Sequence, residues 1–472
     1  MGKRRSKWWW FAAVVILALL WRRCRSTEEQ IDVVIHVKLA PAAPETWIRP
    51  LEGSHASVAG SEPLFQGVGS ALVEEGRAAA TRSGKVMPDL TAWRRVQLRG
   101  TRAAIDAALG DLRERDDVIA AFEAPRPELP FMPGPVTTSD SCPVRTPPYE
   151  QLQGYLRQAP GGIDAPSAWA KPGGRGDAVW FADVEGAWNT KHEDLPGDRV
   201  TAIGPPMPGR DWEMHGTAVL GEVVSRDNEL GMFGIAPNVA RVITSSVTRS
   251  SAAGAIHLAQ AQLRTGDVLL IELHSIGPRG RYLPMEFWDD VFDVIQIATA
   301  RGVVVIEAAG NGFEDLDHEA YKGKLERRTR DSGAIMVGAG APAVSGYTDR
   351  SRLDFSNYGS RVDVQGWGRM VATLDYGDLQ GCDAAQRKYT STFAGTSSAS
   401  PIVAGAALLI ESIVKTERGC PLSPSDLRAL LVETGSPQTD GPHGRAKQHI
   451  GPRPDLSNAI ERARAFPVRC TL

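Results

Sequence analysis

Short apolar runs separated by helical segments are the feature that most limits how this chain can fold. The runs lie at residues 178–182, 268–273, 302–306, 334–337 and 362–364. Residues 286–300 form one apolar helical face from Phe287, Val291, Val294, Ile295 and Ala298. Apolar strands that alternate with helices are typical of a parallel sheet covered on both faces. We therefore expect an α/β fold with its functional residues at the carboxyl ends of the strands.

Residues 393–410, F-A-G-T-S-S-A-S-P-I-V-A-G-A-A-L-L-I, join small hydroxyl residues to a long apolar run. Gly395 allows a tight turn, and Ser397 lies where a helix should begin. The helix is expected to be buried, and the unpaired N–H groups at its start can bind an anion. These are the needs of a nucleophilic serine that generates an oxyanion. The alternative is a Ser/Thr cap on a core helix.

Three further polar residues lie where this architecture places function. Asp183 directly follows the run that ends at residue 182, and the alternative role is a turn or cap aspartate. His215, in M-H-G-T-A-V-L-G-E-V-V, begins an apolar helix, although a lone histidine is usually structural. Asn311, in I-E-A-A-G-N-G, follows the run at 302–306, and N-G is also a common turn pair.

Together these segments resemble the signatures of the subtilisin-like serine proteases (subtilases). G-T-S-S-A-S-P resembles the nucleophile signature and H-G-T the histidine signature. The order Asp183, His215, Ser397 is the Asp–His–Ser chain order of subtilisin, a relative by this resemblance. The resemblance covers about residues 162–465 and implies a subtilisin-like three-layer sandwich around a mainly parallel sheet. No G-x-S-x-G elbow supports an α/β-hydrolase instead.

The resemblance also implies a role for each residue. His215 would take the proton of Ser397 and later protonate the leaving amine. Asp183 would hold the tautomer of the imidazole, while Asn311 and the backbone N–H of Ser397 would stabilise the oxyanion. No cofactor is implied for the chemistry. The chain departs from the family where Val184 and Glu185 stand between the aspartate and Gly186, in place of one Ser or Thr.

Residues 271–278, I-E-L-H-S-I-G-P, resemble the strand with which the family pairs extended substrate. We expect substrate along His274, Ser275, Ile276 and Gly277. The alternative is an ordinary sheet strand followed by a turn.

Two acidic segments carry weaker resemblances. Residues 227–230, D-N-E-L, resemble a calcium loop, with Asn228 and the distant Asp194 as expected ligands; acidic surface turns look the same. Glu314, Asp315 and Asp317 follow Asn311 closely and could favour Lys or Arg before the scissile bond. The alternative is a solvated acidic loop.

The N-terminal third reads as a separate small unit. Strands are expected at residues 32–37, 93–98 and 117–122 and a helix at 101–115, which together suit a small α+β fold. A proline-rich linker follows. The expected organisation is a signal peptide or membrane anchor (1–26), a pro-segment (27–130), a linker (131–148) and a catalytic domain (149–472).

Export is predicted from the first 26 residues. Four cations, Lys3, Arg4, Arg5 and Lys7, precede an apolar stretch at 8–21, as in a signal peptide. No A-x-A site follows it and Arg22, Arg23 and Arg25 do, so an uncleaved anchor is the alternative. If Cys24 leaves with the leader, four cysteines remain, which allow three pairings or stay as free thiols: Cys142, Cys382, Cys420 and Cys470.

We therefore predict a secreted or periplasmic serine endopeptidase, made as a zymogen, that acts on polypeptides and binds its own pro-segment in cis. If the leader stays, the enzyme is anchored to the outer face of the membrane. The net charge of −3 indicates no nucleic-acid partner. The rival predictions are a catalytically impaired binding protein on a protease fold and an esterase that uses the same triad.

Overall fold

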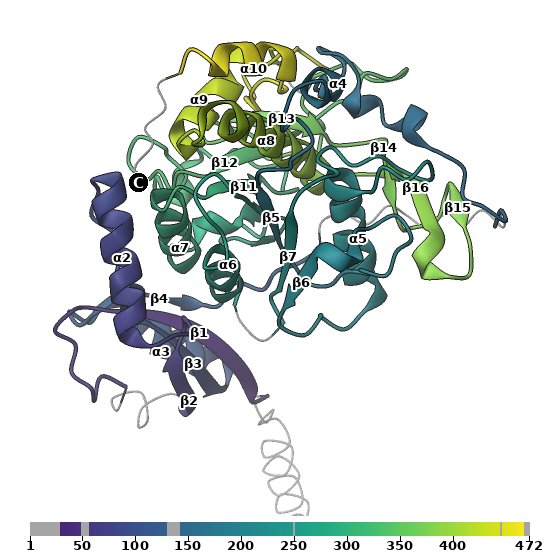
Figure 1. Cartoon of the computed structure of the whole chain (residues 1–472). Coiled ribbons are helices and arrows are strands. Elements are labelled where there is room, and N and C mark those ends of the chain that lie inside the picture. Colours follow the sequence, from purple (N-terminus) through teal and green to yellow (C-terminus); the bar gives the residue numbers. More distant parts are fainter. Residues whose placement is uncertain (1–28, 49–55, 130–141, 249–250, 444–445, 467–472) are drawn as a thin grey trace, which may run out of the picture. The chain divides into compact units, whose positions relative to one another are not determined.

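The computed structural model describes residues 29–48, 56–129, 142–248, 251–443 and 446–466 (Figure 1). These residues divide into two compact units. The smaller comprises the described residues up to Leu64 together with Ala92–Ala124; the larger comprises Phe65–Thr91 and the described residues from Pro125 onward. The predicted leader and residues 131–141 of the predicted linker lie outside the described residues.

The smaller unit is an antiparallel sheet of strand order β2-β3-β1-β4 with one helix. Its elements are β1 (Ile31–Leu39), β2 (Ser57–Pro63), β3 (Trp93–Gly100), α3 (Arg102–Arg113) and β4 (Val118–Glu123). Val33, Ile35 and Val37 of β1 are buried with Ile105 and Leu109 of α3, so α3 covers this face of the sheet. On the other face His36 and Trp93 are also fully buried. Thr101 caps α3, because its side chain accepts the N–H of Ala104. The predicted strands and helix of this region are all present.

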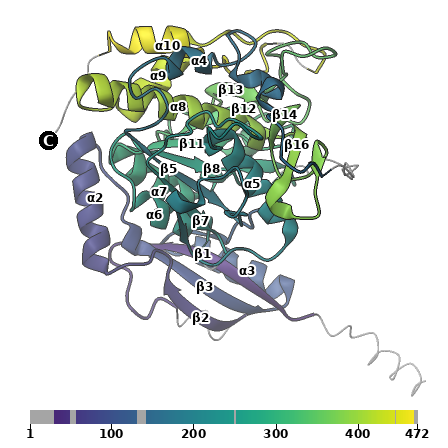
Figure 2. The ribbon, with the colours of Figure 1, turned by 45° about the vertical axis from the view of Figure 1, so that its right-hand side comes forward.

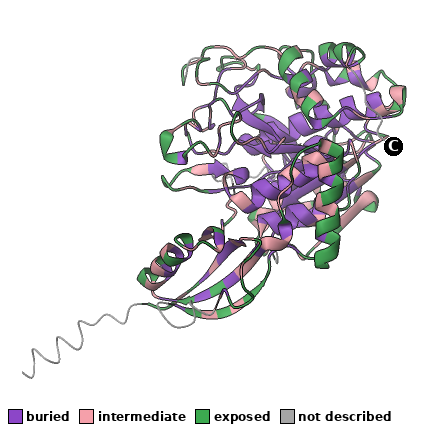
Figure 3. Cartoon of the chain, turned by 90° about the vertical axis from the view of Figure 1, so that its left-hand side faces the viewer, coloured by how far each residue is buried: buried purple, intermediate pink, exposed green. Residues whose placement is uncertain are grey.

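A seven-stranded parallel sheet of order β13-β12-β11-β8-β5-β7-β6 forms the centre of the larger unit. Its strands are β5 (Trp180–Glu185), β6 (Val200–Ile203), β7 (Arg241–Ser246), β8 (Val268–Ile271), β11 (Val304–Ala308), β12 (Ile335–Gly340) and β13 (Val364–Trp367). Each of the five predicted runs overlaps a strand of this sheet, the run at 362–364 by Val364 alone, while β6 and β7 were not predicted. The apolar residues of the runs are buried because helices cover both faces (Figure 3).

Helices pack on the two faces in pairs. On one face α8 (Thr396–Arg418) packs against the sheet and against α5 (Arg210–Val224). On the other face α6 (Ala252–Gln260) and α7 (Asp289–Ala300) pack together, so that α8 and this pair lie on opposite sides of the sheet (Figures 1 and 2). The shorter helices are α4 (Ala165–Trp169), α9 (Pro424–Thr434) and α10 (Leu456–Ala463). The predicted three-layer α/β fold is confirmed.

Helix α8 is long and apolar enough to span a membrane, and no other helix in the described ranges is. Every residue from Thr396 to Val414 is buried among other elements. It is therefore the core helix that the run at 402–410 predicted.

Two small antiparallel sheets flank the central one. Their strands are β9 (His274–Ile276) with β10 (Tyr282–Pro284), and β14 (Val371–Leu374), β15 (Gln380–Gly381) and β16 (Lys388–Phe393). Cys382, directly after β15, forms a disulfide with Cys142. Cys420 is also disulfide-bonded. Cys24 and Cys470 lie outside the described residues.

Helix α2 (Gly69–Ser83) was not predicted from the sequence. It follows β2 in the chain but belongs to the larger unit, where it packs against α7. Glu75 of α2 makes polar contacts with the pair of helices α6 and α7. Its Oε2 lies 3.0 Å from Nε2 of His257, and its Oε1 accepts hydrogen bonds from the side chains of Gln260 (2.5 Å) and Arg301 (3.1 Å). One carboxylate thus bonds three side chains from α6 and the end of α7.

Candidate active site

The carboxyl end of β5 carries two acidic residues on one face of the strand. β5 continues three residues beyond the predicted end at 182, so Asp183 lies within the strand and Glu185 at its end. Residues two apart in a strand point to the same side. β5 pairs with β7 and β8 on its two edges, and both acids are fully buried.

His215 is bonded by Glu185. Its Nδ1 lies 2.6 Å from Oε2 of Glu185, while Oε1 of the same carboxyl accepts the N–H of Gly186 at 2.9 Å. His215 lies in the second turn of α5, where it is buried. Close packing at this point requires Gly216, since a Cβ there would approach the carbonyl oxygen of Ala187 to 2.3 Å.

The predicted pairing of Asp183 with His215 is therefore corrected. The Oδ2 of Asp183 instead accepts the indole N–H of Trp188 at 2.7 Å. Burial, and then the negative charge of Glu185, raise the pKa of Asp183 well above its ordinary value. Asp183 therefore keeps its proton to a higher pH than an ordinary aspartate does, and Glu185 is the acid that faces the imidazole.

Ser397 lies at the start of α8, as predicted. The helix begins at Thr396 after Gly395, whose φ of 119° favours glycine. The side chain of Ser398 bonds the carbonyl oxygens of Trp367 and Gly395, which fixes this turn from the other side. Ser397 itself is buried, with 1% of its surface exposed.

Asn311 is joined directly to this turn. Its Oδ1 accepts both the N–H and the hydroxyl of Thr396, each at 2.9 Å. Its Nδ2 is buried and makes no hydrogen bond to any described residue. An unpaired amide donor at the turn that carries Ser397 is what an oxyanion formed there would require. The Nε2 of His215 is likewise buried without a partner in the described part of the chain.

Glu272 is a polar residue of this site that sequence reasoning did not single out. It directly follows β8, and its Oε1 accepts the hydroxyl of Ser400 at 2.5 Å. Burial raises its pKa well above the ordinary value, and the hydroxyls of Ser400 and Ser397 oppose that rise. Burial and the charge of Glu272 likewise raise the pKa of Glu222 on α5. The signal was available, since a glutamate after an apolar strand occupies the same position as the other candidates.

The predicted substrate strand forms β9 and an edge next to the catalytic cluster. His274 Nδ1 accepts the N–H of Asn311 at 3.4 Å. Burial, and then the charge of His215, lower the pKa of His274 to about 3. His274 and Ser275 are buried, Ile276 is half exposed, and Gly277 turns the chain toward β10. An extended segment of this chain already lies there, because Glu128 N–H bonds the oxygen of His274 at 3.1 Å.

The residues predicted for calcium are brought together. Oδ2 of Asp194 accepts the N–H of Met232 at 2.7 Å, and the side chain of Asn228 bonds the same carboxyl. Burial raises the pKa of Asp194 to about 8. No group of three or more His, Cys, Asp or Glu side chains suited to a metal occurs in the described ranges.

Glu314, the acidic residue that most closely follows Asn311, is not free to bind a basic side chain of a substrate. Glu314 is buried between Arg279 and Arg281, with Nε–Oε distances of 3.3 and 4.0 Å. Asp317 bonds the backbone and hydroxyl of Ser360. These contacts remove the basis for a basic preference from Glu314.

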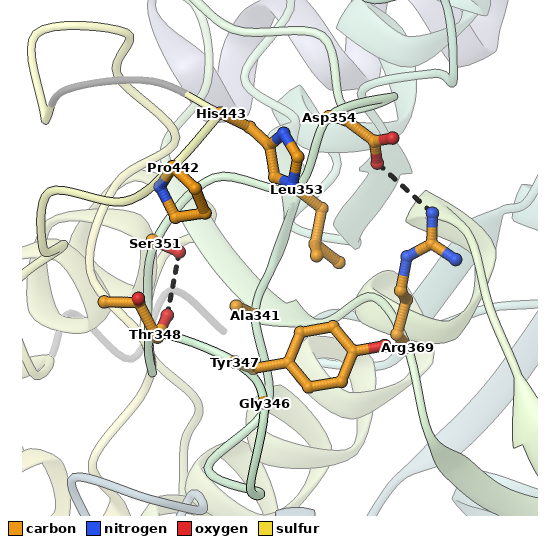
Figure 4. Close-up of a pocket in the computed structure, with 10 residues that line it drawn as sticks. All are labelled: Ala341, Gly346, Tyr347, Thr348, Ser351, Leu353, Asp354, Arg369, Pro442 and His443. Atoms are coloured by element: carbon orange, nitrogen blue, oxygen red, sulfur yellow. Dashed lines mark hydrogen bonds and ion pairs between the residues drawn. The ribbon is translucent and has the colours of Figure 1, made fainter.

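A cavity of about 290 Å³ lies away from these residues, among loops between Ala341 and Arg369 and at Pro442–His443 (Figure 4). Its polar groups bond one another: Asp354 to Arg369, and the hydroxyl of Ser351 to the carbonyl oxygen of Thr348. None of the predicted site residues lines it.

The site described above defines a serine hydrolase built on a parallel α/β sheet. Residues 157–451 match the profile of the subtilase family, and the chain belongs to that family of serine endopeptidases. It is 25% identical over 343 residues to an intracellular serine protease of Paenibacillus polymyxa, covering 69% of this chain and 96% of the relative. It is 29% identical to subtilisin Savinase of Lederbergia lenta over 53% of this chain and 81% of the relative.

Two solved structures show the same fold at low identity. The epidermin leader peptide processing serine protease of Staphylococcus aureus matches with a TM-score of 0.55 at 15% identity, over 93% of this chain and 100% of its own. Fervidolysin of Fervidobacterium pennivorans matches with a TM-score of 0.54 at 16% identity, over 94% and 62%. Members of the family need no cofactor for their chemistry.

Proposed function

We propose that this chain is an exported serine endopeptidase, made as a zymogen, with a Glu185–His215–Ser397 triad. Ser397 Oγ attacks the peptide carbonyl carbon while His215 Nε2 takes the hydroxyl proton. Glu185 holds the proton on Nδ1 and stabilises the imidazolium that forms. The proton then passes to the leaving amine, and water hydrolyses the acyl-serine by the reverse sequence.

The hydrogen bond of 2.6 Å between His215 and Glu185 carries this proposal. It fixes the imidazole so that the buried and unpaired Nε2 is the nitrogen left to act as base. The unpaired Nδ2 of Asn311, held at Thr396, supplies the oxyanion donor together with the N–H of Ser397.

Export is supported by two features of the chain. A basic and then apolar stretch opens the sequence, and a disulfide joins Cys142 to Cys382. Disulfides persist mainly in oxidising compartments. The enzyme is therefore secreted or periplasmic, or held at the outer face of the membrane if the leader stays.

The zymogen proposal rests on the residues that follow the N-terminal unit. Glu128 pairs antiparallel with His274 on the edge strand next to Asn311. A chain segment in this place excludes other peptides, so the enzyme stays inactive until the segment is cut and leaves. The N-terminal unit is then the pro-segment and a partner of the catalytic unit in cis.

Structural calcium is proposed at Asp194 and Asn228. The Oδ1 of Asp194 is buried without a partner among the described side chains and backbone groups, and a carboxylate with an amide oxygen suits Ca²⁺. These two residues would hold the ion with backbone carbonyl groups of the loop. Chelation should lower the unfolding temperature of the wild-type chain and leave that of Asp194→Asn nearly unchanged.

Labelling with a serine-directed fluorophosphonate tests the catalytic proposal. The wild-type protein should be labelled at Ser397, and Ser397→Ala and His215→Ala should not be. A wild-type protein that folds and processes but takes no label would instead be the catalytically impaired binding protein. Hydrolysis of simple esters without hydrolysis of any peptide would identify the esterase.

A further inference from the structure

The hairpin of β9 and β10 holds an extended segment of the same chain. β9 pairs with β10 through Tyr282, Leu283 and Pro284, and its first residue, His274, also forms an isolated antiparallel bridge with Glu128. Glu128 N–H donates to the oxygen of His274 at 3.1 Å. The segment therefore extends the hairpin by one antiparallel bridge, the contact with which strand addition begins.

The side chain of Glu128 is bonded as well as its backbone. The hydroxyl of Tyr282 donates to Oε2 of Glu128 at 2.7 Å. The ring of Tyr282 stacks on the imidazole of His274, with 4.1 Å between ring centroids and 9° between planes. A hydrogen bond from a neutral phenol to a carboxylate is charge-assisted, so it is stronger than the bond that the phenol would make to a neutral amide.

Asn357 joins the backbone of Tyr282 to the loop that carries Asn311. Asn357 Nδ2 donates to the carbonyl oxygen of Tyr282 at 2.8 Å, and its Oδ1 accepts the N–H of Gly312 at 3.0 Å. A Cβ at Gly312 would approach the oxygen of Tyr282 to 2.3 Å. These contacts fix the backbone of Tyr282, and stacking on His274 orients its ring. The phenol is therefore a preorganised donor, which discriminates better than a mobile one.

We propose that Tyr282 makes this protease selective for glutamate at the peptide position that pairs with His274, and that Glu128 is the first residue so recognised. The substrate class is thus an extended polypeptide with an acidic residue at that position. This inference rests on the proposed peptidase function of the same site.

Peptides that copy residues 123–132 test the selectivity, with Glu, Gln or Lys at the position of Glu128. The protein purified after expression of the full wild-type chain should cleave the Glu peptide about tenfold better in kcat/KM than the Gln peptide, because a bond to a charged group is lost. In Tyr282→Phe the ratio should fall to about one. Tyr347→Phe, an exposed tyrosine far along the chain, is the matched control and should keep the wild-type ratio. Equal cleavage of the Glu and Gln peptides by the wild-type protein would overturn the selectivity.

Hydrogen exchange of the Glu128 amide tests the same contact without catalysis. In the full chain carrying Ser397→Ala, adding Tyr282→Phe or Glu128→Gln should speed exchange of that amide about tenfold. Unchanged exchange in both double variants would overturn the inference. If no peptide is cleaved but exchange responds as expected, the peptidase proposal fails while recognition of glutamate by Tyr282 stands.

Discussion

His215 takes its carboxylate partner from Glu185, with 2.6 Å between Nδ1 and Oε2, although Asp183 lies on the same strand face two residues earlier. The Nδ1 of His215 carries one proton, so it can donate to only one of the two carboxyl groups. Asp183 accepts the indole N–H of Trp188, and burial with the charge of Glu185 raises its pKa well above the ordinary value. The longer side chain at the end of the strand therefore replaces the shorter one within it.

The first prediction compares the two variants in which one of these acids is replaced by its amide. Glu185→Gln should lower kcat/KM about 10³- to 10⁴-fold, because the amide orients the wrong tautomer and cannot stabilise the imidazolium. Asp183→Asn should stay within about threefold of wild type, because an amide oxygen can still accept the indole N–H of Trp188 and the imidazole is bonded by Glu185. Peptide hydrolysis by the two purified variants measures both. A large loss in Asp183→Asn with little loss in Glu185→Gln would return the triad to Asp183.

The sheet, the core helix and three of the proposed site residues could be predicted from the sequence, because the patterns that indicate them are local. Strand and helix periodicity are local, so the run at 402–410 and the placement of His215, Asn311 and Ser397 could be read directly. The choice between Asp183 and Glu185 could not. Side-chain alternation puts both on one face, and the decision depends on where β5 ends and on contacts with Trp188 and α5.

Other features depend on contacts between residues distant in the chain. Glu75 meets His257 across 182 residues, and Tyr282 meets Glu128 across 154. No local pattern encodes such pairs. In the acidic loop the sequence suggests that Glu314 is a free charge, but the side chain is buried between Arg279 and Arg281, which lie more than thirty residues earlier in the chain. Helix α2 was missed although its alanine-rich sequence has high helix propensity.

The second prediction concerns Glu272 and pH. Its pKa is raised in the folded protein by burial, so the folded state binds a proton that the unfolded state releases. This contribution to stability is complete below the unfolded pKa and is lost as pH rises toward the folded pKa. In a Ser397→Ala background, which prevents self-digestion, Glu272→Gln should weaken the fall in unfolding temperature between pH 5 and 8. Parallel curves for the two proteins would contradict the raised pKa of Glu272 in the folded state.

The third prediction concerns the contact between α2 and α6. Glu75→Ala leaves His257 and Arg301 without their shared carboxylate and should cost about 2 kcal/mol in the free energy of unfolding. Burial opposes ionisation of Glu75, but hydrogen bonds from His257 and Gln260 outweigh it and lower the pKa. The contribution is therefore present above the ordinary pKa of a glutamate and is lost as pH falls through the lowered value.

Denaturant unfolding of the Ser397→Ala chain at pH 7 and at pH 3 measures this contribution. Glu74→Ala is the matched control, because the neighbouring Glu74 is exposed and makes only a 3.9 Å ion pair with Arg77. That control should change stability by less than about 0.5 kcal/mol at either pH. Equal effects of the two substitutions at pH 7 would mean that the three contacts of Glu75 add nothing to stability.

The last prediction concerns processing of the chain by its own site. Glu128 lies paired with His274, next to Asn311, so the segment after the N-terminal unit is held at the strand proposed to bind peptide substrate. If Ser397 cuts within this segment, Ser397→Ala must accumulate as the full precursor, and Glu185→Gln must process far more slowly than Asp183→Asn. Intact mass and N-terminal sequencing of each protein, made in a host lacking other proteases, measure this. Normal trimming of the Ser397→Ala chain in that host would mean that another enzyme makes the cut. The segment around Glu128 would then be an inhibitor of the site and not its substrate.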